Sequence, residues 1–139
     1  MLLQWMRRLR VCLQANIIAP ACLSRVVRRN PIVMEASDIQ RIVREEVSRG
    51  EAFNNSHGIT PQNVRQFLVP PFSVRTDPDD TESPPRDMWV VLQERPQGAD
   101  GYAVVYDPQV SGWGVVERAG TDYVLVCAAD SLASALTSM

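Results

Sequence analysis

Hydrophobic positions recur at helical spacing over residues 38–49, and this pattern predicts an amphipathic helix. The apolar side chains that share one face of it are Ile39, Ile42, Val43 and Val47. Ser37 and Gln40 have the spacing of a capping box at its start, and Gly50 is a natural residue to end it. The segment therefore has a defined start, a defined end and one face to bury.

A shorter second helix is predicted between Thr60 and the Pro70-Pro71 pair. Thr60 is a favourable N-cap, and Pro61 would occupy the first helical position, where its missing N–H costs nothing. The residue before a proline is disfavoured in the helical region, so this helix should stop there. Residues 72–75 are then expected to form a short edge strand.

From residue 88 onward, runs of β-forming residues alternate with short turns. Strands are predicted over residues 88–94, 102–107, 113–118 and 123–127. Connections this short favour antiparallel pairing over βαβ crossovers. A last helix, capped by Asp130 or Ser131, carries Leu132, Leu136 and Met139 on one face.

These elements predict an α+β protein with N-terminal helices, a four- to five-stranded antiparallel meander sheet and a C-terminal helix. We expect the helices to pack on one face of the sheet. Gly112 and Gly114, which flank Trp113, would permit a bulge or a tight hairpin. The length of 139 residues leaves room for one domain.

Charge divides the chain into two parts. Residues 1–34 contain six arginines and no acid, whereas residues 35–139 contain eight arginines and all 16 acids, a net charge of −8. We therefore predict a basic extension over residues 1–33 and a single acidic α+β domain over residues 34–139.

Three interpretations of the basic extension compete. It resembles a secretory or lipoprotein signal in its charged start and in the stretch from Ala19 to Cys22, although three arginines follow closely. It resembles an organelle transit peptide in being rich in arginine and free of acids. We favour a third interpretation, in which Met34 opens the domain, the upstream residues come from an over-long gene prediction, and the protein is cytoplasmic. If the extension is a genuine targeting segment, the protein would instead be exported or sent to an organelle. The extension is too short and too polar to span a membrane.

Composition removes several kinds of catalytic chemistry. A chain without lysine has no lysine Schiff base and no phosphate-binding P-loop. One histidine and three cysteines without a C-x-x-C pair do not build the common zinc sites. His57, the one side chain that ordinarily titrates near neutral pH, is expected to be a polar loop residue without a catalytic role. We therefore predict no cofactor and no enzymatic activity.

An enzyme remains the alternative, because three carboxylates fall late in predicted strands. Glu94, Asp107 and Glu117 could converge in a pocket on the sheet, as paired carboxylates do in glycosidases. Such a pocket would raise the pKa of one carboxyl group and would take a small ligand or substrate.

The segment from Asp77 to Pro85 reads as an acidic, proline-rich loop. Its acids begin like a calcium-binding loop, but Glu82 and Met88 stand where such a loop has its glycine and its last glutamate. We therefore predict a solvated loop and no metal site.

Aromatic residues concentrate in the predicted sheet, where alternation puts Tyr102 and Tyr106 on one face. On a sheet face left uncovered by helices they would form a binding patch; otherwise they belong to the core. The predicted partner-binding residues are Trp89, Tyr102, Tyr106 and Trp113, with Asp77, Asp79, Asp80 and Glu82 as a charged rim. Trp113→Ala should then abolish binding and leave the fold intact.

Three stretches, W-V-V-L-Q-E at 89–94, G-Y-A-V-V-Y-D-P at 101–108 and G-W-G-V at 112–115, are similar to a pattern in small uncharacterised bacterial proteins. Compact acidic α+β proteins of this kind resemble the immunity proteins of bacterial toxin systems. The resemblance implies a bacterial, non-enzymatic protein, and it assigns no functional residue.

A net charge of −8 repels phosphates, so we expect the acidic domain to bind no nucleic acid. An acidic surface instead suits a basic protein partner. We predict a small protein-binding module, immunity- or antitoxin-like, that binds such a partner through an acidic surface containing aromatic residues. A homodimer formed through an exposed sheet face is a third hypothesis.

Overall fold

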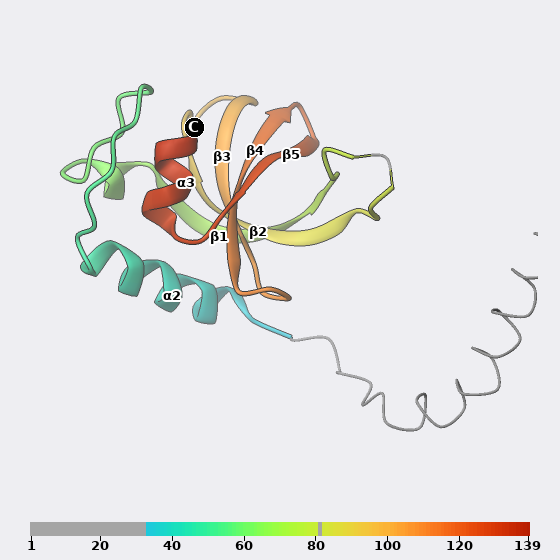
Figure 1. The fold of residues 1–139 in the computed structure, drawn as a ribbon, viewed down its shortest axis with the longest axis horizontal. Coiled ribbons are helices and arrows are strands. Elements are labelled where there is room, and N and C mark those ends of the chain that lie inside the picture. Colours follow the sequence, from blue (N-terminus) through green and yellow to red (C-terminus); the bar gives the residue numbers. More distant parts are fainter. Residues whose placement is uncertain (1–32, 81) are drawn as a thin grey trace, which may run out of the picture. The chain divides into compact units, whose positions relative to one another are not determined.

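The computed structural model describes residues 33–80 and 82–139 (Figure 1). Apart from Val33, the basic extension and its three interpretations lie outside the described residues. The elements, in chain order, are α2 (Ala36–Ser48), the 3-10 turn η1 (Val64–Gln66), β1 (Leu68–Thr76), β2 (Arg86–Gln93), β3 (Asp100–Asp107), β4 (Gly112–Ala119), β5 (Asp122–Ala129) and α3 (Leu132–Ser138). They confirm the predicted α+β fold.

The five strands form one sheet in the order β1-β2-β3-β4-β5, and every neighbouring pair is antiparallel. The four strands predicted from residue 88 onward are β2 to β5, each within two residues of its predicted bounds. The last helix, α3, is also confirmed, and the Ser131 hydroxyl caps it by accepting the Ser134 N–H at 3.0 Å.

Helix α2 begins earlier than predicted, and its capping residues differ. Glu35 is the N-cap, and its N–H donates to the carboxylate of Asp38 at 3.0 Å. Ser37 and Gln40 were the wrong capping pair, because the helix already includes Ser37 and places Asp38 at its third position. Gly50 follows the helix as predicted, with a positive φ of 64° that glycine adopts without strain.

The predicted second helix was wrong, because only the single 3-10 turn η1 forms there. Thr60 still caps the turn that leads into η1, since its hydroxyl accepts the Asn63 N–H at 3.3 Å. The chain then enters β1 and passes through Pro70-Pro71 in an extended conformation. Prolines are tolerated there because β1 is an edge strand whose register is irregular between Leu68 and Phe72.

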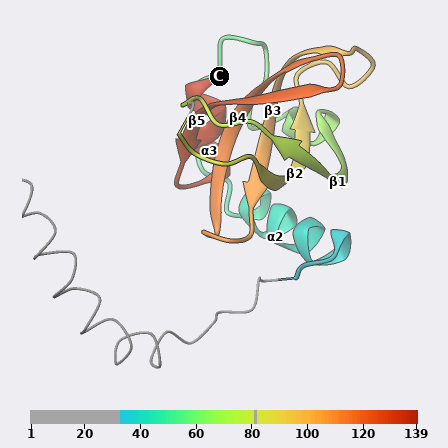
Figure 2. The ribbon, with the colours of Figure 1, turned by 90° about the vertical axis from the view of Figure 1, so that its right-hand side faces the viewer.

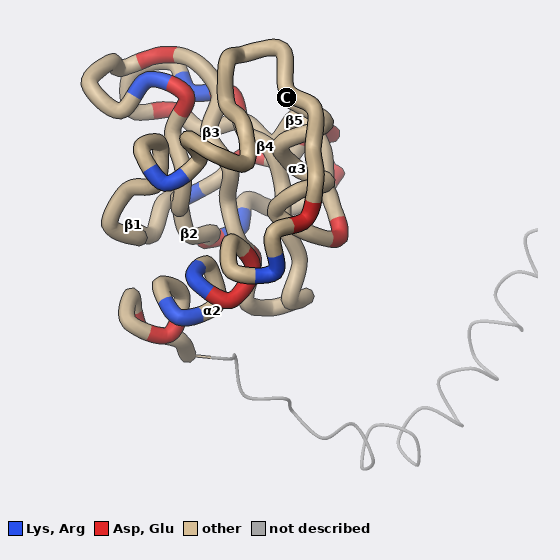
Figure 3. Tube along the Cα trace, turned by 90° about the vertical axis from the view of Figure 1, so that its left-hand side faces the viewer, with Lys and Arg blue, Asp and Glu red and all other residues tan. Residues whose placement is uncertain are grey.

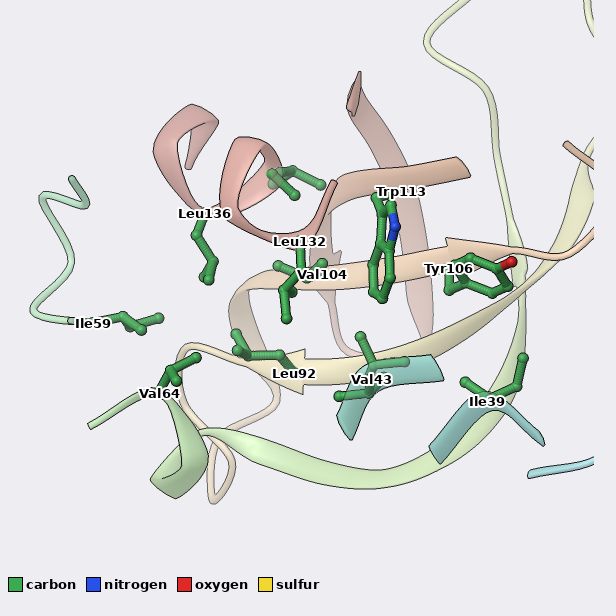
Figure 4. Packing of buried hydrophobic residues seen from close by; sticks show 13 residues of the cluster. Ile39, Val43, Ile59, Val64, Leu92, Val104, Tyr106, Trp113, Leu132 and Leu136 are labelled. Carbon is green, nitrogen blue, oxygen red and sulfur yellow. The ribbon is translucent and has the colours of Figure 1, made fainter. Parts of the chain in front are cut away.

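Both helices cover one face of the sheet, and the buried residues beneath them form the outer cluster. Its members are Ile39, Val43, Ile59, Val64, Val91, Leu92, Val104, Tyr106, Trp113, Val115, Leu132, Ala135 and Leu136. Figure 4 shows Ile39 and Val43 of α2 pointing toward Tyr106 and Trp113. The expectation that the helices pack on one face is therefore confirmed.

The sheet curls until its two edge strands meet. Asp77, the residue after β1, donates its N–H to the Tyr123 carbonyl at 2.9 Å and accepts the Leu125 N–H at 2.8 Å. This contact is an isolated parallel bridge beside Val124 in an otherwise antiparallel sheet. Figure 2 shows the twist of the strands that brings the two edges toward each other, with α2 beneath them.

The curl buries the second face of the sheet as well. The buried residues there form the inner cluster, Met88, Val90, Ala103, Val105 and Val116, and the half-buried residues packed against it are Val69, Val74, Tyr123 and Leu125. The described sheet therefore carries a hydrophobic core on each face. In the described sheet, neither face is left uncovered for the aromatic residues to form a surface patch.

Candidate functional site

The acidic loop, residues 77–80 and 82–85, connects β1 to β2 and is held at its start by the bridge from Asp77 to β5. Figure 1 draws it in yellow-green, on the side of the strands away from α3. Asp80 folds the loop locally, because its Oδ1 accepts the N–H of Ser83 at 2.6 Å and of Glu82 at 3.0 Å, and its Oδ2 accepts the Ser83 hydroxyl at 3.0 Å. These hydrogen bonds, the one from the Ser83 N–H first, lower the pKa of Asp80 below its ordinary value.

Among the residues that the structure describes, the acids of this loop have no cationic partner. Five of the eight arginines after residue 33 form ion pairs with carboxylates, namely Arg41, Arg49, Arg75, Arg86 and Arg95. Within the described ranges, none of those pairs includes a rim acid, the name used below for Asp77, Asp79, Asp80 and Glu82. In Figure 3, by contrast, acidic and basic positions alternate along α2. The loop therefore keeps a concentrated negative charge.

An open cavity of about 580 Å³, its mouth included, lies beside the acidic loop. Asp77, Asp79 and Asp80 line one part of it, and Met88 of the inner cluster and Leu125, which packs against that cluster, line another. Across residues 33–80 and 82–139, no three His, Cys, Asp or Glu side chains are grouped closely enough to hold a metal ion. The cavity thus combines carboxylates with an apolar wall.

Thr76 and Arg86 also line this cavity, and they differ in whether their polar atoms have a partner. Thr76 is 1% exposed, and its Oγ1 has no hydrogen-bond partner in the described part of the chain. An unpartnered buried hydroxyl destabilises a fold by about 1–3 kcal/mol. Arg86, by contrast, is ion-paired with the buried carboxylate of Asp107, so its positive charge is compensated.

The aromatic residues predicted to bind a partner lie on the other face of the sheet. Tyr106 and Trp113 are each 6% exposed and belong to the outer cluster, and Trp89 and Tyr102 are half-buried and pack against that cluster. The cavity beside the rim acids opens instead beside residues of the inner cluster. The structure thus separates the predicted aromatic anchors from the predicted rim. With Trp113 in the core, its replacement by alanine is expected to affect folding and not binding alone.

The three strand carboxylates do not converge. Glu94 and Glu117 lie opposite Tyr102 on its two neighbouring strands, and two strand spacings separate their backbones by about 10 Å. Asp107 lies five residues further along β3, about 17 Å away at the usual rise of a strand. Asp107 is also already paired with Arg86. These positions therefore do not bring the three carboxylates together at one point of the sheet.

Sequence reasoning missed a polar cluster around His57. Its Nδ1 lies 2.6 Å from Glu94 Oε1, and its ring meets the Tyr102 ring edge-on with centroids 5.4 Å apart. The other carboxylate oxygen of Glu94 accepts the Tyr102 N–H at 3.0 Å. An ionised carboxylate only accepts, so we assign the shared proton to Nδ1. The two partners are 37 positions apart, and the only local signal was a histidine in a polar loop.

In the neutral imidazole, a proton on Nδ1 leaves Nε2 of His57 as an acceptor, which is the geometry of a general base. In the part of the chain that the structure describes, no hydroxyl or thiol is hydrogen-bonded to the imidazole. The neighbouring hydrogen bonds have a structural effect, because Asn55 accepts the His57 N–H at 2.7 Å and donates to the Leu136 carbonyl at 2.6 Å. We interpret the cluster as an anchor that ties the loop before η1 to β2, β3 and α3.

The anchor predicts a pH-dependent contribution to stability. Burial raises the pKa of Glu94, but the Tyr102 N–H and His57 favour the carboxylate more strongly, so the pKa lies below its ordinary value of 4.5. The ionised group therefore stabilises the fold above that value, and the contribution is lost as the pH falls through the lowered pKa of the folded state. Glu94→Gln should cost about 1 kcal/mol of unfolding free energy at neutral pH.

Urea denaturation measures this loss, which should shrink as the pH falls below 4.5. Glu117→Gln is the matched control, because Glu117 is exposed on the opposite side of Tyr102. It should cost less than about 0.5 kcal/mol. A loss for Glu94→Gln that is the same at every pH would contradict the predicted role of its charge.

In comparisons with known proteins, no family model, curated protein or solved structure matches this chain at a significant level. No helix of the described residues combines the length and the apolar character that crossing a bilayer requires. The functional interpretation therefore depends on the geometry of the rim acids, the cavity and their surroundings.

Proposed function

We propose that residues 34–139 form a protein-binding module that binds a basic protein partner through the acidic loop. The observation that carries this proposal is the group of four rim acids, which have no cationic partner within residues 33–80 and 82–139, while most arginines of those ranges are ion-paired. The net charge of −8 over residues 35–139 adds a long-range field of the same sign.

A basic partner would gain from this surface in two ways. The field accelerates the encounter of oppositely charged molecules, and this effect weakens as salt is added. At the exposed rim, each ion pair contributes less than about 1 kcal/mol, so the affinity requires several such contacts together. The acids at 77, 79, 80 and 82 stand close enough in the chain to act together.

We propose that the role is non-enzymatic and immunity- or antitoxin-like. The small size, the acidity and the α+β architecture support this class, as they do in the resemblance to immunity proteins. The partner surface differs from the one predicted from sequence, because Tyr106 and Trp113 are core residues. Charge and the cavity, and not an aromatic patch, would then determine recognition.

A charge-neutralised variant of the acidic loop tests this proposal. The full chain is titrated into a labelled, arginine-rich synthetic peptide, and binding is followed by fluorescence anisotropy. The test variant combines Asp77→Asn, Asp79→Asn, Asp80→Asn and Glu82→Gln. We expect it to bind at least about tenfold more weakly than the wild type, because four rim contacts are weakened together.

The control variant removes four exposed acids elsewhere and therefore changes the net charge equally. It combines Glu45→Gln, Glu51→Gln, Glu117→Gln and Asp130→Asn. We expect its affinity to stay within about threefold of the wild type, because only the long-range field changes. Equal losses in the two variants, or no loss in the loop variant, would overturn the assignment of the binding surface to the acidic loop.

A further inference from the structure

We propose that the cavity beside the acidic loop receives the guanidinium group of one arginine side chain of the basic partner. The inference rests on the proposed function, and it specifies which feature of a basic partner the site recognises. It follows from three properties of the cavity: an apolar wall, two carboxylates with no ion-pair partner among the described residues, and a buried hydroxyl that also lacks a partner there.

The apolar wall comes from Met88 of the inner cluster and from Leu125, which packs against that cluster; both line the cavity. An arginine side chain carries a hydrocarbon stem below its charged head, and such stems pack on apolar surface while the head remains among polar groups. A small inorganic cation would gain nothing from this wall. The described carboxylates are also not grouped closely enough for a metal site.

The two carboxylates without an ion-pair partner in the described part of the chain are those of Asp77 and Asp79. The backbone of Asp77 is fixed by its two hydrogen bonds to β5, at 2.9 and 2.8 Å, so its side chain starts from a defined position at the cavity. Asp80 is different, because hydrogen bonds within the loop occupy both of its oxygens. Arg86 does not compete for Asp77 or Asp79, since it is paired with Asp107.

The unpartnered hydroxyl is that of Thr76. Side chains alternate along β1, so Thr76 faces the same side as Val74, the side of the inner cluster where Met88 and Leu125 line the cavity. Thr76 is 1% exposed, and its Oγ1 lacks a partner among the described residues. A donor entering the cavity would satisfy this atom.

A guanidinium group suits this combination better than an ammonium group does. It is a planar fork with five N–H donors, so it reaches a hydroxyl oxygen and a carboxylate at the same time. An ammonium group is a compact point charge that is more strongly hydrated, and it loses more hydration when it enters a partly apolar cavity. The structure therefore predicts selectivity for arginine over lysine at equal charge.

Three peptides of one length test this selectivity against the full chain. One carries arginines, the second carries lysine at each of those positions, and the third carries the uncharged analogue citrulline. We expect the arginine peptide to bind about tenfold more tightly than the lysine peptide, and the citrulline peptide to bind most weakly. Each variant below is measured with all three peptides and by thermal denaturation.

Thr76→Val keeps the shape of the side chain and removes only the hydroxyl. We expect the preference for arginine over lysine to fall to about threefold or less, because one hydrogen bond to the guanidinium is lost. The midpoint of thermal denaturation should stay the same or rise, because the hydroxyl has no hydrogen-bond partner among residues 33–80 and 82–139. A lower midpoint would show that the hydroxyl has a structural partner, and this would overturn its assigned role.

Asp77→Asn tests the role of the Asp77 carboxylate in arginine binding, and Asp122→Asn is its matched control. Both acids are exposed and neighbour the bridge between β1 and β5, but only Asp77 lines the cavity. We expect Asp77→Asn to weaken arginine binding about tenfold and Asp122→Asn to weaken it less than about threefold. Equal effects of the two substitutions would overturn the assignment of Asp77 to the guanidinium.

The outcomes separate this inference from the proposed function. Equal affinities for the arginine and lysine peptides, together with a loss of binding in the loop-neutralised variant, would overturn the arginine cavity and leave the acidic surface in place. Full binding by the loop-neutralised variant would overturn both. A preference for arginine that disappears in Thr76→Val and Asp77→Asn, and persists in Asp122→Asn, would support both.

Discussion

Replacing Trp113 with alanine is expected to lower the free energy of unfolding by about 3–5 kcal/mol. The indole is 6% exposed, and its ring packs edge-to-face on Tyr106 with centroids 5.0 Å apart. Residues of α2 point toward both rings (Figure 4). Alanine would leave a cavity between a sheet and a helix, which such rigid elements fill only partly.

The loss is large relative to the stability of a domain of this size, which is about 5–15 kcal/mol. Thermal denaturation followed by circular dichroism should show a midpoint lowered by on the order of 15–20 °C. Trp113→Phe is the control, because it keeps an aromatic ring and most of the volume; it should cost less than about 1.5 kcal/mol. An unchanged midpoint for Trp113→Ala, with binding of the arginine-rich peptide lost, would mean that Trp113 is a surface anchor after all.

Gly114→Ala is expected to cost about 1–3 kcal/mol, although it adds a single methyl group. A Cβ at this position would lie 2.9 Å from Leu125 Cδ1 and 3.1 Å from the carbonyl oxygen of Cys127. The backbone carbonyl moves only if β5 moves, so the strain is not relieved by rotating a side chain. Because Leu125 also forms a wall of the cavity, the same substitution should weaken binding of the arginine-rich peptide.

Gly112→Ala is the matched control for this substitution. The two glycines lie on either side of Trp113 in β4, but a Cβ on Gly112 would meet mainly the exposed side chain of Val110, at 3.1 Å. That side chain can turn away, so we expect a change within about 0.5 kcal/mol. Urea denaturation compares the two variants, and equal losses would contradict the close packing of β5 against Gly114.

Local patterns predicted most of the fold. The alternation of apolar residues located β2 to β5, and the stripe that includes Ile39 and Val43 located the buried face of α2. The largest error concerns the segment from Thr60 to Thr76, where Pro70-Pro71 was interpreted as the end of a helix. A proline pair is equally compatible with an edge strand, and strand position in a sheet is a property of the tertiary fold.

The candidate site was predicted only in part. The rim acids were identified because four acids stand within six positions, which is visible in a single sequence. The sequence left open whether Tyr106 and Trp113 belong to the core or to a binding patch, because a strand pattern shows which residues share a face but not what covers that face. The pair of His57 and Glu94, and the cavity wall of Met88 and Leu125, join residues from distant segments.

The sequence by itself determined the class of the fold, the approximate bounds of β2 to β5 and the excess of negative charge, because these depend on local periodicity and on composition. Only the tertiary structure decided that both faces of the sheet are buried. The curl that brings Asp77 to β5 makes the inner face a second core and places Thr76 in a cavity with three of the rim acids, Asp77, Asp79 and Asp80. The helices cover the outer face, so Tyr106 and Trp113 are core residues and not a surface patch. Such long-range contacts depend on the twist accumulated over five strands, which no local pattern encodes.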